Sequence, residues 1–405
     1  MSKSIDQQVA MLMERTHYGD AVMRRTMEHE LRERLAEGRP LRVYYGIDAT
    51  TPELHIGHSV PIRKLAQFQA LGHECMLLVG DFTARIGDPT ERDRTRPLLS
   101  AEQVQANGRI LAEQASRLLD PERTQVRFNS EWLSRLAFGD IVRLASCFTV
   151  AQFLERENFA RRYAAGVPIH LHEFFYAVMQ GYDAVALQAD VQVGGIDQTF
   201  NLLAGRRLQE SFGQRPQVIV TTPLLPGTDG RQKMSKSLGN AIAAVASAED
   251  MYGRLMSIPD DAMRIYFELL TSCGANDTAA LFGELAAGER HPRDVKMLLA
   301  RLVTSVFHGE TAAAQAQAHF ARIFQRRELP AELPDHIVRE PVLLVDLLVE
   351  LRIAGSKSEA RRLILQGGVR IDGQRITDIN NLVAPERCPL VLQAGRRRFI
   401  KLRAP

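Results

Sequence analysis

Cysteine is scarce in this chain of 405 residues, and no two cysteines lie close together in the sequence. The four are Cys75, Cys147, Cys273 and Cys388, so the chain has no CxxC motif. This spacing disfavours a disulfide framework and a cysteine zinc site, and we predict no metal ligands. It favours reduced thiols of a cytoplasmic protein.

Long apolar runs are also missing. The first residues include Asp6, Gln7, Gln8 and Glu14, where a secretory signal would need an apolar stretch. No segment reaches the length of a membrane span. We therefore expect a cytoplasmic protein with no membrane partner.

Net charge is small, but it is unevenly distributed. The total is +3, whereas residues 342–405 carry twelve lysines and arginines against six acidic residues, which leaves −3 for the rest. A basic tail on a faintly acidic body is typical of a protein that binds a polyanion. The content of 45% hydrophobic and 24% charged residues indicates a globular protein, and the length allows two or three domains.

Short apolar runs alternate with helical patterns between residues 41 and 244, which predicts an α/β domain with a parallel sheet. A leading helix is expected within residues 1–38, where apolar residues recur every four positions. In such sheets ligands bind at the carboxyl ends of the strands. Strands are predicted at residues 42–47, 75–79, 126–128, 184–187 and 218–221.

The second half of the chain changes character. Residues 247–327 have a helical pattern, with helices expected at 294–307 and 311–324, and residues 329–341 contain three prolines, which favour a stiff linker. A helix starting at Ser356 and a hairpin over residues 369–376 follow. The predicted domains are 1–245, α/β with the N-terminal helix; 246–330, α-helical; 331–341, linker; and 342–405, small α+β.

The stretch Tyr44–Pro61 predicts a strand, a tight loop and a helix N-terminus. The helix is expected to start at Thr51-Pro52, which would place His55 and His58 on one helix face. Backbone N–H groups at a helix start attract anions such as nucleotide phosphates, and Gly57 leaves room for a ring or a ribose. Alone, this HxGH pattern is equally compatible with surface or capping histidines.

A second motif, Lys233-Met234-Ser235-Lys236-Ser237, follows a loop rich in glycine. Alone it would be a solvated basic loop, although two lysines can also close over a triphosphate. HIGH near the start and KMSKS at the end of one domain together resemble the class I aminoacyl-tRNA synthetases. The resemblance implies a Rossmann-like catalytic domain that uses ATP with Mg²⁺, followed by a helical domain that binds tRNA.

Between the two motifs, Tyr176, Gln180 and Asp183 recur at spacings of four and three, which places them on one helix face. A polar face of this kind points into a cavity or toward solvent. Together with Tyr44 and the segment Val193–Gln198, it closely resembles the tyrosyl-tRNA synthetase family over essentially the whole chain. The KMSKS spelling and the compact tail are similar to the second bacterial type of that family.

That resemblance implies a role for each matching residue. Tyrosine-binding residues would be Tyr44 and Asp183 at the phenol, Asp88, Tyr176 and Gln180 at the ammonium group, and Gln198 near the carboxylate. ATP-binding residues would be Tyr45, Asp48, His55, Gly57, His58, Gly195, Asp197, Lys233, Ser235 and Lys236. Catalytic residues would be Thr50, His55, His58, Lys233 and Lys236, with Arg92 a further candidate for the pyrophosphate.

The chemistry of a phenol is consistent with this allocation. Its hydroxyl both donates and accepts, so an ionised Asp183 can accept its proton while Tyr44 completes the pair. Phenylalanine would leave both groups unpaired. No editing domain is therefore expected, and the chain has no long insertion to hold one. Ala49 stands where the family usually has proline, and Pro61 follows the HIGH motif.

The tail resembles the S4 RNA-binding domain over Ser356–Ile376, although a solvated basic face is the alternative. The resemblance implies RNA contacts by Lys357, Arg361, Arg362 and Arg370, with Arg396, Arg397, Arg398 and Lys401 adding charge. The resemblance to the synthetase family also implies a homodimer and tRNA(Tyr) as partner.

Three other functions remain open from the sequence. A tryptophanyl-tRNA synthetase would share the fold and both motifs, but it lacks the tail and has no use for Tyr44 with Asp183. An RNA-binding protein derived from a synthetase would not need the intact histidines and lysines. A small-molecule adenylyltransferase with HxGH would not need a basic RNA domain.

Overall fold

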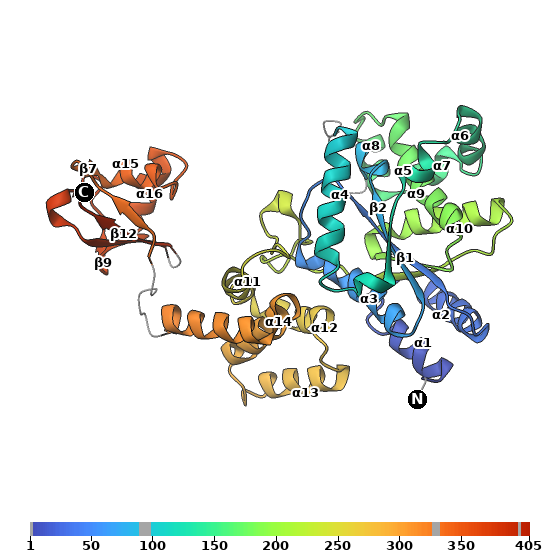
Figure 1. Cartoon of the computed structure of the whole chain (residues 1–405), viewed down its shortest axis with the longest axis horizontal. Coiled ribbons are helices and arrows are strands. Elements are labelled where there is room, and N and C mark those ends of the chain that lie inside the picture. Colours follow the sequence, from blue (N-terminus) through green and yellow to red (C-terminus); the bar gives the residue numbers. More distant parts are fainter. Residues whose placement is uncertain (1–2, 89–98, 326–332, 396–397) are drawn as a thin grey trace. The chain divides into compact units, whose positions relative to one another are not determined.

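The computed structural model describes residues 3–88, 99–325, 333–395 and 398–405 (Figure 1). The chain forms two compact units, Met1–Ala314 and Gln315–Pro405. Within the described ranges, no helix combines the length and the apolar character needed to cross a membrane. All four cysteines are free thiols; we expected them to be buried, but only Cys75 is, and Cys147, Cys273 and Cys388 are half-buried.

The first unit is built on a parallel sheet of five strands in the order β3-β2-β1-β4-β5. The central strand β1 lies between β2 and β4, where the direction of the strand order reverses, and this opens a crevice at the carboxyl ends. The predicted parallel α/β architecture is confirmed. The strands are β1 Arg42–Asp48, β2 Glu74–Gly80, β3 Thr124–Phe128, β4 Val191–Gly195 and β5 Val218–Thr222.

Four of the five predicted strands are confirmed, and the one at residues 184–187 is wrong. These residues form the last turn of the helix α9, Leu171–Leu187, which ends where Gln188 adopts a left-handed conformation with φ of 47°. Ala184 and Leu187 are buried against the sheet as part of a helix, and a short apolar run alone does not distinguish a strand from a helix. The actual fourth strand follows immediately at Val191.

Helices cover both faces of the sheet. On one face, a large core joins the strands to α1, α2, α3 and α4, and on the other Tyr44 packs with Met76 and Leu78 against α9. This division follows from strand alternation, because Val43, Tyr45 and Ile47 belong to the first core. The bounds are α1 Ile5–Met13, α2 Ala21–Ala36, α3 Ser59–Ala70, α4 Ala101–Ala115 and α10 Thr199–Ser211.

The leading helix expected within residues 1–38 is in fact two helices. Arg15 and Gly19 both have positive φ, of 57° and 70°, which interrupts the helical path. Asp20 then caps α2 by accepting hydrogen bonds from the backbone N–H groups of Val22 and Met23. Met27, Leu31 and Leu35 are buried, as their spacing predicts.

Short helices connect β3 to α9, and longer ones follow the sheet. The predicted helical region is confirmed, with the long helix α14 kinked at Gly309, where φ is 80°. The bounds are α5 Ser130–Leu133, α6 Phe138–Ala145, α7 Val150–Leu154, α8 Glu157–Ala164, α11 Ala248–Leu255, α12 Met263–Leu270, α13 Ala275–Ala286 and α14 Pro292–Phe320.

The second unit packs two helices on a mixed sheet of order β6-β12-β11-β8-β9, beside a β7-β10 pair. The predicted hairpin is present, with a turn at Asp372-Gly373. Part of the expected linker contributes the strand β6, which pairs with β12. The bounds are β6 Asp335–Ile337, β7 Val342–Leu343, α15 Leu344–Glu350, α16 Lys357–Leu365, β8 Val369–Ile371, β9 Gln374–Ile376, β10 Leu382–Val383, β11 Leu390–Ala394 and β12 Arg398–Arg403.

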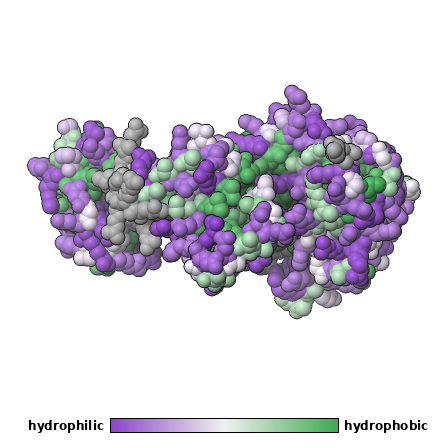
Figure 2. Space-filling view, turned by 90° about the horizontal axis from the view of Figure 1, so that it is seen from below, coloured by the Kyte–Doolittle hydropathy of each residue, from purple (hydrophilic) through white to green (hydrophobic). Residues whose placement is uncertain are grey.

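The second unit has its own hydrophobic core, which includes Leu344, Leu348, Ile364, Val369 and Leu402. Hydrophilic residues dominate the molecular face drawn in Figure 2, with smaller groups of hydrophobic residues between them. Most of the large apolar side chains therefore stabilise the interiors, as in other globular proteins.

Candidate active site

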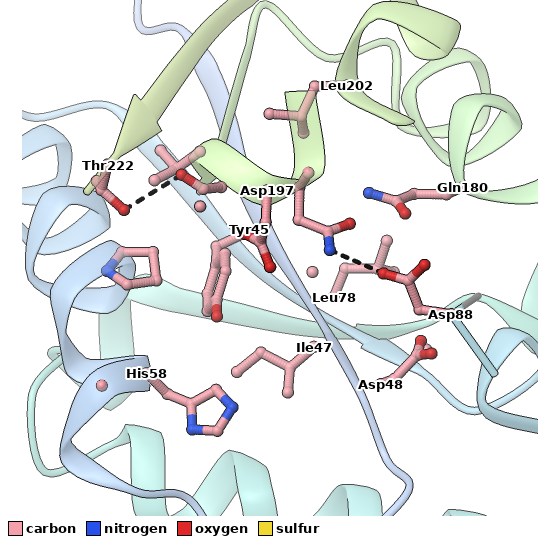
Figure 3. Close-up of a pocket in the computed structure, with 18 of the residues that line it drawn as sticks. Tyr45, Ile47, Asp48, His58, Leu78, Asp88, Gln180, Asp197, Leu202 and Thr222 are labelled. Atoms are coloured by element: carbon pink, nitrogen blue, oxygen red, sulfur yellow. Dashed lines mark hydrogen bonds between the residues drawn. The ribbon is translucent and has the colours of Figure 1, made fainter. Parts of the chain in front are cut away.

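A cavity of about 300 Å³ lies at the carboxyl ends of the central strands, where the strand order reverses (Figure 3). It brings together side chains from β1, the HIGH segment, α9, the segment after β4 and the KMSKS loop. Of the described residues predicted to bind tyrosine or ATP, only Lys236 is not part of its lining. The lining includes Tyr44, Tyr45, Asp48, Thr50, His55, Gly57, His58, Asp88, Tyr176, Gln180, Asp183, Gly195, Asp197, Gln198, Lys233 and Ser235.

One end of the cavity combines a phenol and a carboxyl group. Asp183 on α9 is only 2% exposed, and it accepts hydrogen bonds from Trp132 Nε1 at 2.8 Å and Asn129 Nδ2 at 3.3 Å. Burial raises the pKa of Asp183 to about 8. Tyr44 is fully buried, and burial together with the charge of Asp183 raises the pKa of its hydroxyl well above the usual value. Both groups are suited to a ligand hydroxyl that donates and accepts.

A second side of the cavity is acidic. Asp48, Asp88 and Gln180 point toward the cavity from one side, and Tyr45 and His58 lie opposite them (Figure 3). Gln198 donates from Nε2 to Asp88 Oδ2 at 2.8 Å. Two carboxylates next to each other attract a cation, such as an ammonium group.

Asp48 is held in place by its neighbours. Tyr176 donates its hydroxyl to Asp48 Oδ2 at 3.1 Å, and Thr83 donates to Oδ1 at 2.7 Å. A Cβ atom on Gly80 would lie 2.2 Å from Asp48 Oδ1 and 2.4 Å from Thr83 Oγ1. The glycine that ends β2 is therefore required for this arrangement.

The HIGH segment differs from its predicted local structure. No helix starts at Thr51-Pro52, because His55 forms an isolated bridge with Ala243 and Ile56 N–H donates to the carbonyl of Ile242. A single 3-10 turn, η1 at Ile56–His58, precedes α3, which begins at Ser59. The motif is thus fixed to the strand-like segment that follows the KMSKS loop.

The two histidines of this segment form a compact neutral pair. Their ring centroids are 3.8 Å apart, and the backbone N–H of His55 donates to His58 Nδ1 at 3.2 Å. Burial lowers the pKa of His55 to about 2 and that of His58 to about 4. A Cβ on Gly57 would lie 2.9 Å from the His55 ring, so this position needs glycine. At neutral pH these imidazoles act as hydrogen-bonding groups without charge.

The KMSKS lysines are both paired with carboxylates. Lys233 Nζ lies 2.7 Å from Asp197 Oδ2, and Lys236 Nζ lies 3.0 Å from Glu53 Oε2. Burial lowers the pKa of Lys233 to about 8 and raises that of Asp197 to about 6. Met234 between them is buried and anchors the loop. An anionic ligand would have to exchange these partners for its own oxygens.

Comparison with known proteins identifies the family. Residues 36–325 match the family described as tRNA synthetases class I (W and Y), and residues 342–386 match the S4 domain. A tyrosine–tRNA ligase from Thermotoga maritima is 50% identical over 375 residues, 93% of each chain. Another from Moorella thermoacetica is 48% identical over 98% of this chain and 97% of its own. The chain belongs to the tyrosine–tRNA ligases.

Solved structures of tyrosyl-tRNA synthetases share the fold of this ligase. The enzyme from Archaeoglobus fulgidus, complexed with L-tyrosine, has a TM-score of 0.60 and 22% identity over 78% of this chain and all of its own. A truncated mitochondrial enzyme from Aspergillus nidulans has a TM-score of 0.63 and 22% identity over 80% of this chain and 94% of its own. The predicted fold class is confirmed.

Sequence reasoning missed several residues around the ligase cavity. Asn129 and Trp132 contact Asp183, and Thr83 holds Asp48. Trp132 is the only tryptophan of the chain and follows β3 closely, a signal that could have identified it. Arg156 is buried, and its Cζ lies 5.4 Å from the centre of the Phe159 ring and 4.6 Å from that of Phe200. No short sequence motif includes it.

The second unit of the ligase carries the predicted RNA-binding residues on exposed surface. Lys357, Arg361, Arg362 and Arg370 are all exposed, the first three on α16. Lys357 Nζ is paired with Asp346 Oδ1 at 2.7 Å. The predictions for Arg92, Arg396 and Arg397 fall outside the described residues.

Proposed function

We propose that this chain activates L-tyrosine with ATP, giving tyrosyl adenylate and pyrophosphate, and then transfers tyrosine to the 3′-terminal ribose of tRNA(Tyr). The observation that carries the proposal is the buried combination of Tyr44 and Asp183 at the base of the cavity. A phenol hydroxyl bonds to both groups, whereas an apolar ring leaves the buried Tyr44 hydroxyl without a partner and Asp183 without a ligand donor.

Tyrosine would lie with its phenol at this base and its amino acid group near the acidic side. Asp88, Tyr176 and Gln180 would receive the ammonium group, and Gln198 would lie near the carboxylate. The bond from Gln198 to Asp88 supports this role, since it places an amide beside the ammonium site. The hydroxyl of Tyr176 bonds to Asp48, so Tyr176 would also orient that carboxylate.

ATP would occupy the part of the cavity formed by HIGH and KMSKS. Tyr45, Gly195 and Asp197 would contact the ribose, and Asp48 would lie near the nucleotide. The phosphates would be held by backbone and side chains of both motifs, namely Thr50, His55, Gly57, His58, Lys233, Ser235 and Lys236. The ATP phosphates would hold Mg²⁺, which would supply positive charge there. Among the described residues there is no group of three or more side chains that could hold a metal ion.

The reaction needs no general base, because the tyrosine carboxylate is already ionised when it attacks the α-phosphate. The chain would accelerate the reaction by positioning the reactants and by stabilising charge that gathers on the phosphates. His55 and His58 would contribute hydrogen bonds as neutral rings. Lys233 and Lys236 would contribute charge once they leave Asp197 and Glu53.

Amino-acid-dependent exchange of pyrophosphate into ATP tests the function. We expect exchange with tyrosine, and none above background with phenylalanine, tryptophan or no amino acid. Exchange with tryptophan would favour the tryptophanyl alternative, since the family model covers both enzymes. No exchange from folded protein would favour an RNA-binding protein without catalysis.

We infer that the ligase acts as a homodimer. Large apolar side chains are exposed on α6, α7, α8 and the start of α9, which is unusual for a free surface of a single chain. Symmetric pairing of two copies would cover this apolar surface. Its residues and their exposed fractions are Phe138 83%, Val142 53%, Val150 61%, Tyr163 69% and Leu171 75%.

The remaining assignments are also proposals. The KMSKS spelling and compact tail support the second bacterial type of the family, and the tRNA partner supports a cytoplasmic location. We propose residues 1–245 as the catalytic domain, 246–330 as the helical domain and 342–405 as the RNA-binding domain after a linker. Within the last, tRNA phosphates would contact Lys357, Arg361, Arg362 and Arg370.

A further inference from the structure

A group of buried glutamines lies behind the base of the active-site cavity. Gln192, Gln209 and Gln217 are 2%, 1% and 0% exposed, although glutamine is a surface residue in most proteins. Gln192 is on β4, Gln209 on α10, and Gln217 directly precedes β5. A buried amide is costly unless its donors and acceptors are paired, so three together indicate a specific arrangement.

The three amides form a connected network. Gln209 Oε1 accepts from the backbone N–H of Gln217 at 2.6 Å, and Gln217 Nε2 donates to Gln192 Oε1 at 2.5 Å. Gln209 Nε2 donates to the carbonyl of Ala189 at 2.9 Å. A Cβ on Gly205 would lie 2.6 Å from Gln217 Nε2, so this glycine leaves space for the network.

Backbone carbonyls determine which way these amides point. The carbonyl of Ala189 can only accept, so it fixes the nitrogen of Gln209. The carbonyl of Leu202 lies 3.4 Å from Gln217 Nε2, so the nitrogen of Gln217 is the atom that faces Gln192. The network therefore has a defined direction of donation.

Tyr44 is next to this network. In the sheet Tyr44 pairs with Gln192, so the two side chains lie on the same face of neighbouring strands. The Tyr44 hydroxyl is fully buried and has no partner in full hydrogen-bonding geometry. The Gln217 side chain opposes the upward pKa shift that burial and Asp183 cause at this hydroxyl.

We propose that Gln217 and Gln192 are positioning residues that orient the Tyr44 hydroxyl, so that its hydrogen points at the phenolic oxygen of the substrate. Gln217 Nε2 has two hydrogens: one is donated to Gln192 Oε1, and the other would be shared between the Leu202 carbonyl and the Tyr44 oxygen. Tyr44 then donates to the substrate phenol, and the substrate donates to Asp183. This inference rests on the proposed function, since it takes tyrosine as the substrate.

The discrimination between tyrosine and phenylalanine tests the role. In Gln217→Met, which keeps the size of the side chain but has no amide, KM for tyrosine in pyrophosphate exchange should rise by about tenfold with little change in kcat. The inhibition constant of phenylalanine, which makes no bond to Tyr44, should stay unchanged. Gln214→Met is the matched control, because Gln214 lies on the same segment and bonds the carbonyl of Val185; it should change neither constant.

The outcomes separate the possibilities. An equal rise for tyrosine and phenylalanine would mean that Gln217 only supports the fold, and no change in either would mean that it does not orient Tyr44. If Gln217→Met does not fold by circular dichroism, Gln192→Met, which removes the acceptor that holds Gln217, is interpreted in the same way. Absence of exchange in the wild-type protein would instead contradict the proposed function itself.

Discussion

Asp183 connects substrate choice to the stability of the fold. Burial raises its pKa from 3.8 to about 8, despite the hydrogen bonds that Trp132 and Asn129 donate to it. Between these pH values the folded chain holds a proton that the unfolded chain releases. This group therefore lowers the free energy of unfolding as the pH rises through that window.

Asp183→Asn should remove this pH dependence. We expect the thermal midpoint of the variant, relative to wild type, to be higher at about pH 8 than at about pH 5. Tyrosine-dependent exchange should fall by about tenfold to a hundredfold, because the carboxyl group that accepts a hydrogen bond from the phenol is replaced by an amide. Thermal unfolding at both pH values measures the first effect, and an equal shift at both would contradict the raised pKa.

The paired lysines of the KMSKS loop predict a kinetic signature. Replacing Lys233 and Lys236 together by alanine should lower kcat for adenylate formation by at least about a hundredfold, with a much smaller change in KM for ATP. Each lysine already has a carboxylate partner before ATP binds. We therefore expect the lysines to stabilise the transition state more than they stabilise bound ATP. Arg231→Ala, in the same loop, is the control, and comparable losses in kcat and KM would contradict this assignment.

Individual site residues were largely predictable from the sequence because two motifs and one helix face carry them. Residues that hold other site residues in place, such as Asn129 and Gln217, were not predictable. Their contacts join segments far apart in the chain, and no spacing pattern records such contacts.

Among the elements, β2 requires glycine at its last residue, Gly80. Gly80→Ala would place a Cβ atom within 2.2 Å of Asp48 Oδ1 and 2.4 Å of Thr83 Oγ1. We expect the displaced carboxylate to raise KM for tyrosine or ATP by about tenfold in exchange kinetics. Gly253→Ala, where a Cβ would meet nothing within 4 Å, is the matched control. Unchanged kinetics in Gly80→Ala would show that Asp48 is not needed in this position.

Helices and strands were predicted well where the spacing of apolar residues was regular, and poorly at the ends of the elements. The run at residues 184–187 is apolar in every position that a buried strand would use, yet it completes α9. The HIGH segment lacks the helix start expected at Thr51-Pro52, because backbone hydrogen bonds with Ile242 and Ala244 hold it extended. In both cases tertiary packing, absent from local sequence, decides the structure.

At the scale of the whole molecule, the second unit should affect tRNA more than adenylation. Arg361→Glu with Arg362→Glu, both on the exposed face of α16, should weaken aminoacylation by about tenfold or more and leave pyrophosphate exchange unchanged. Deletion of residues 333–405, which removes β6 together with the sheet it joins, should act in the same direction. Loss of both activities would show instead that this unit supports the fold of the first.

The exposed apolar surface predicts the oligomeric state. Leu171→Glu, at a residue that is 75% exposed, should convert the dimer to a monomer in sedimentation at micromolar concentration. Val22→Glu is the control, because Val22 is also exposed, at 60%, but lies on α2, outside that surface. A wild-type monomer would contradict the homodimer directly.

The N-terminal segment packs against the last strand of the sheet, and this has a consequence for synthesis on the ribosome. His17 N–H donates to the carbonyl of Thr221, and Tyr18 donates its hydroxyl to the carbonyl of Ile219, so the N-terminal segment contacts the last strand of the sheet. As the chain emerges, this segment has to wait until β5 has been translated before it can pack. Chaperones that bind nascent chains would therefore meet α1 and α2 exposed throughout the synthesis of the catalytic core.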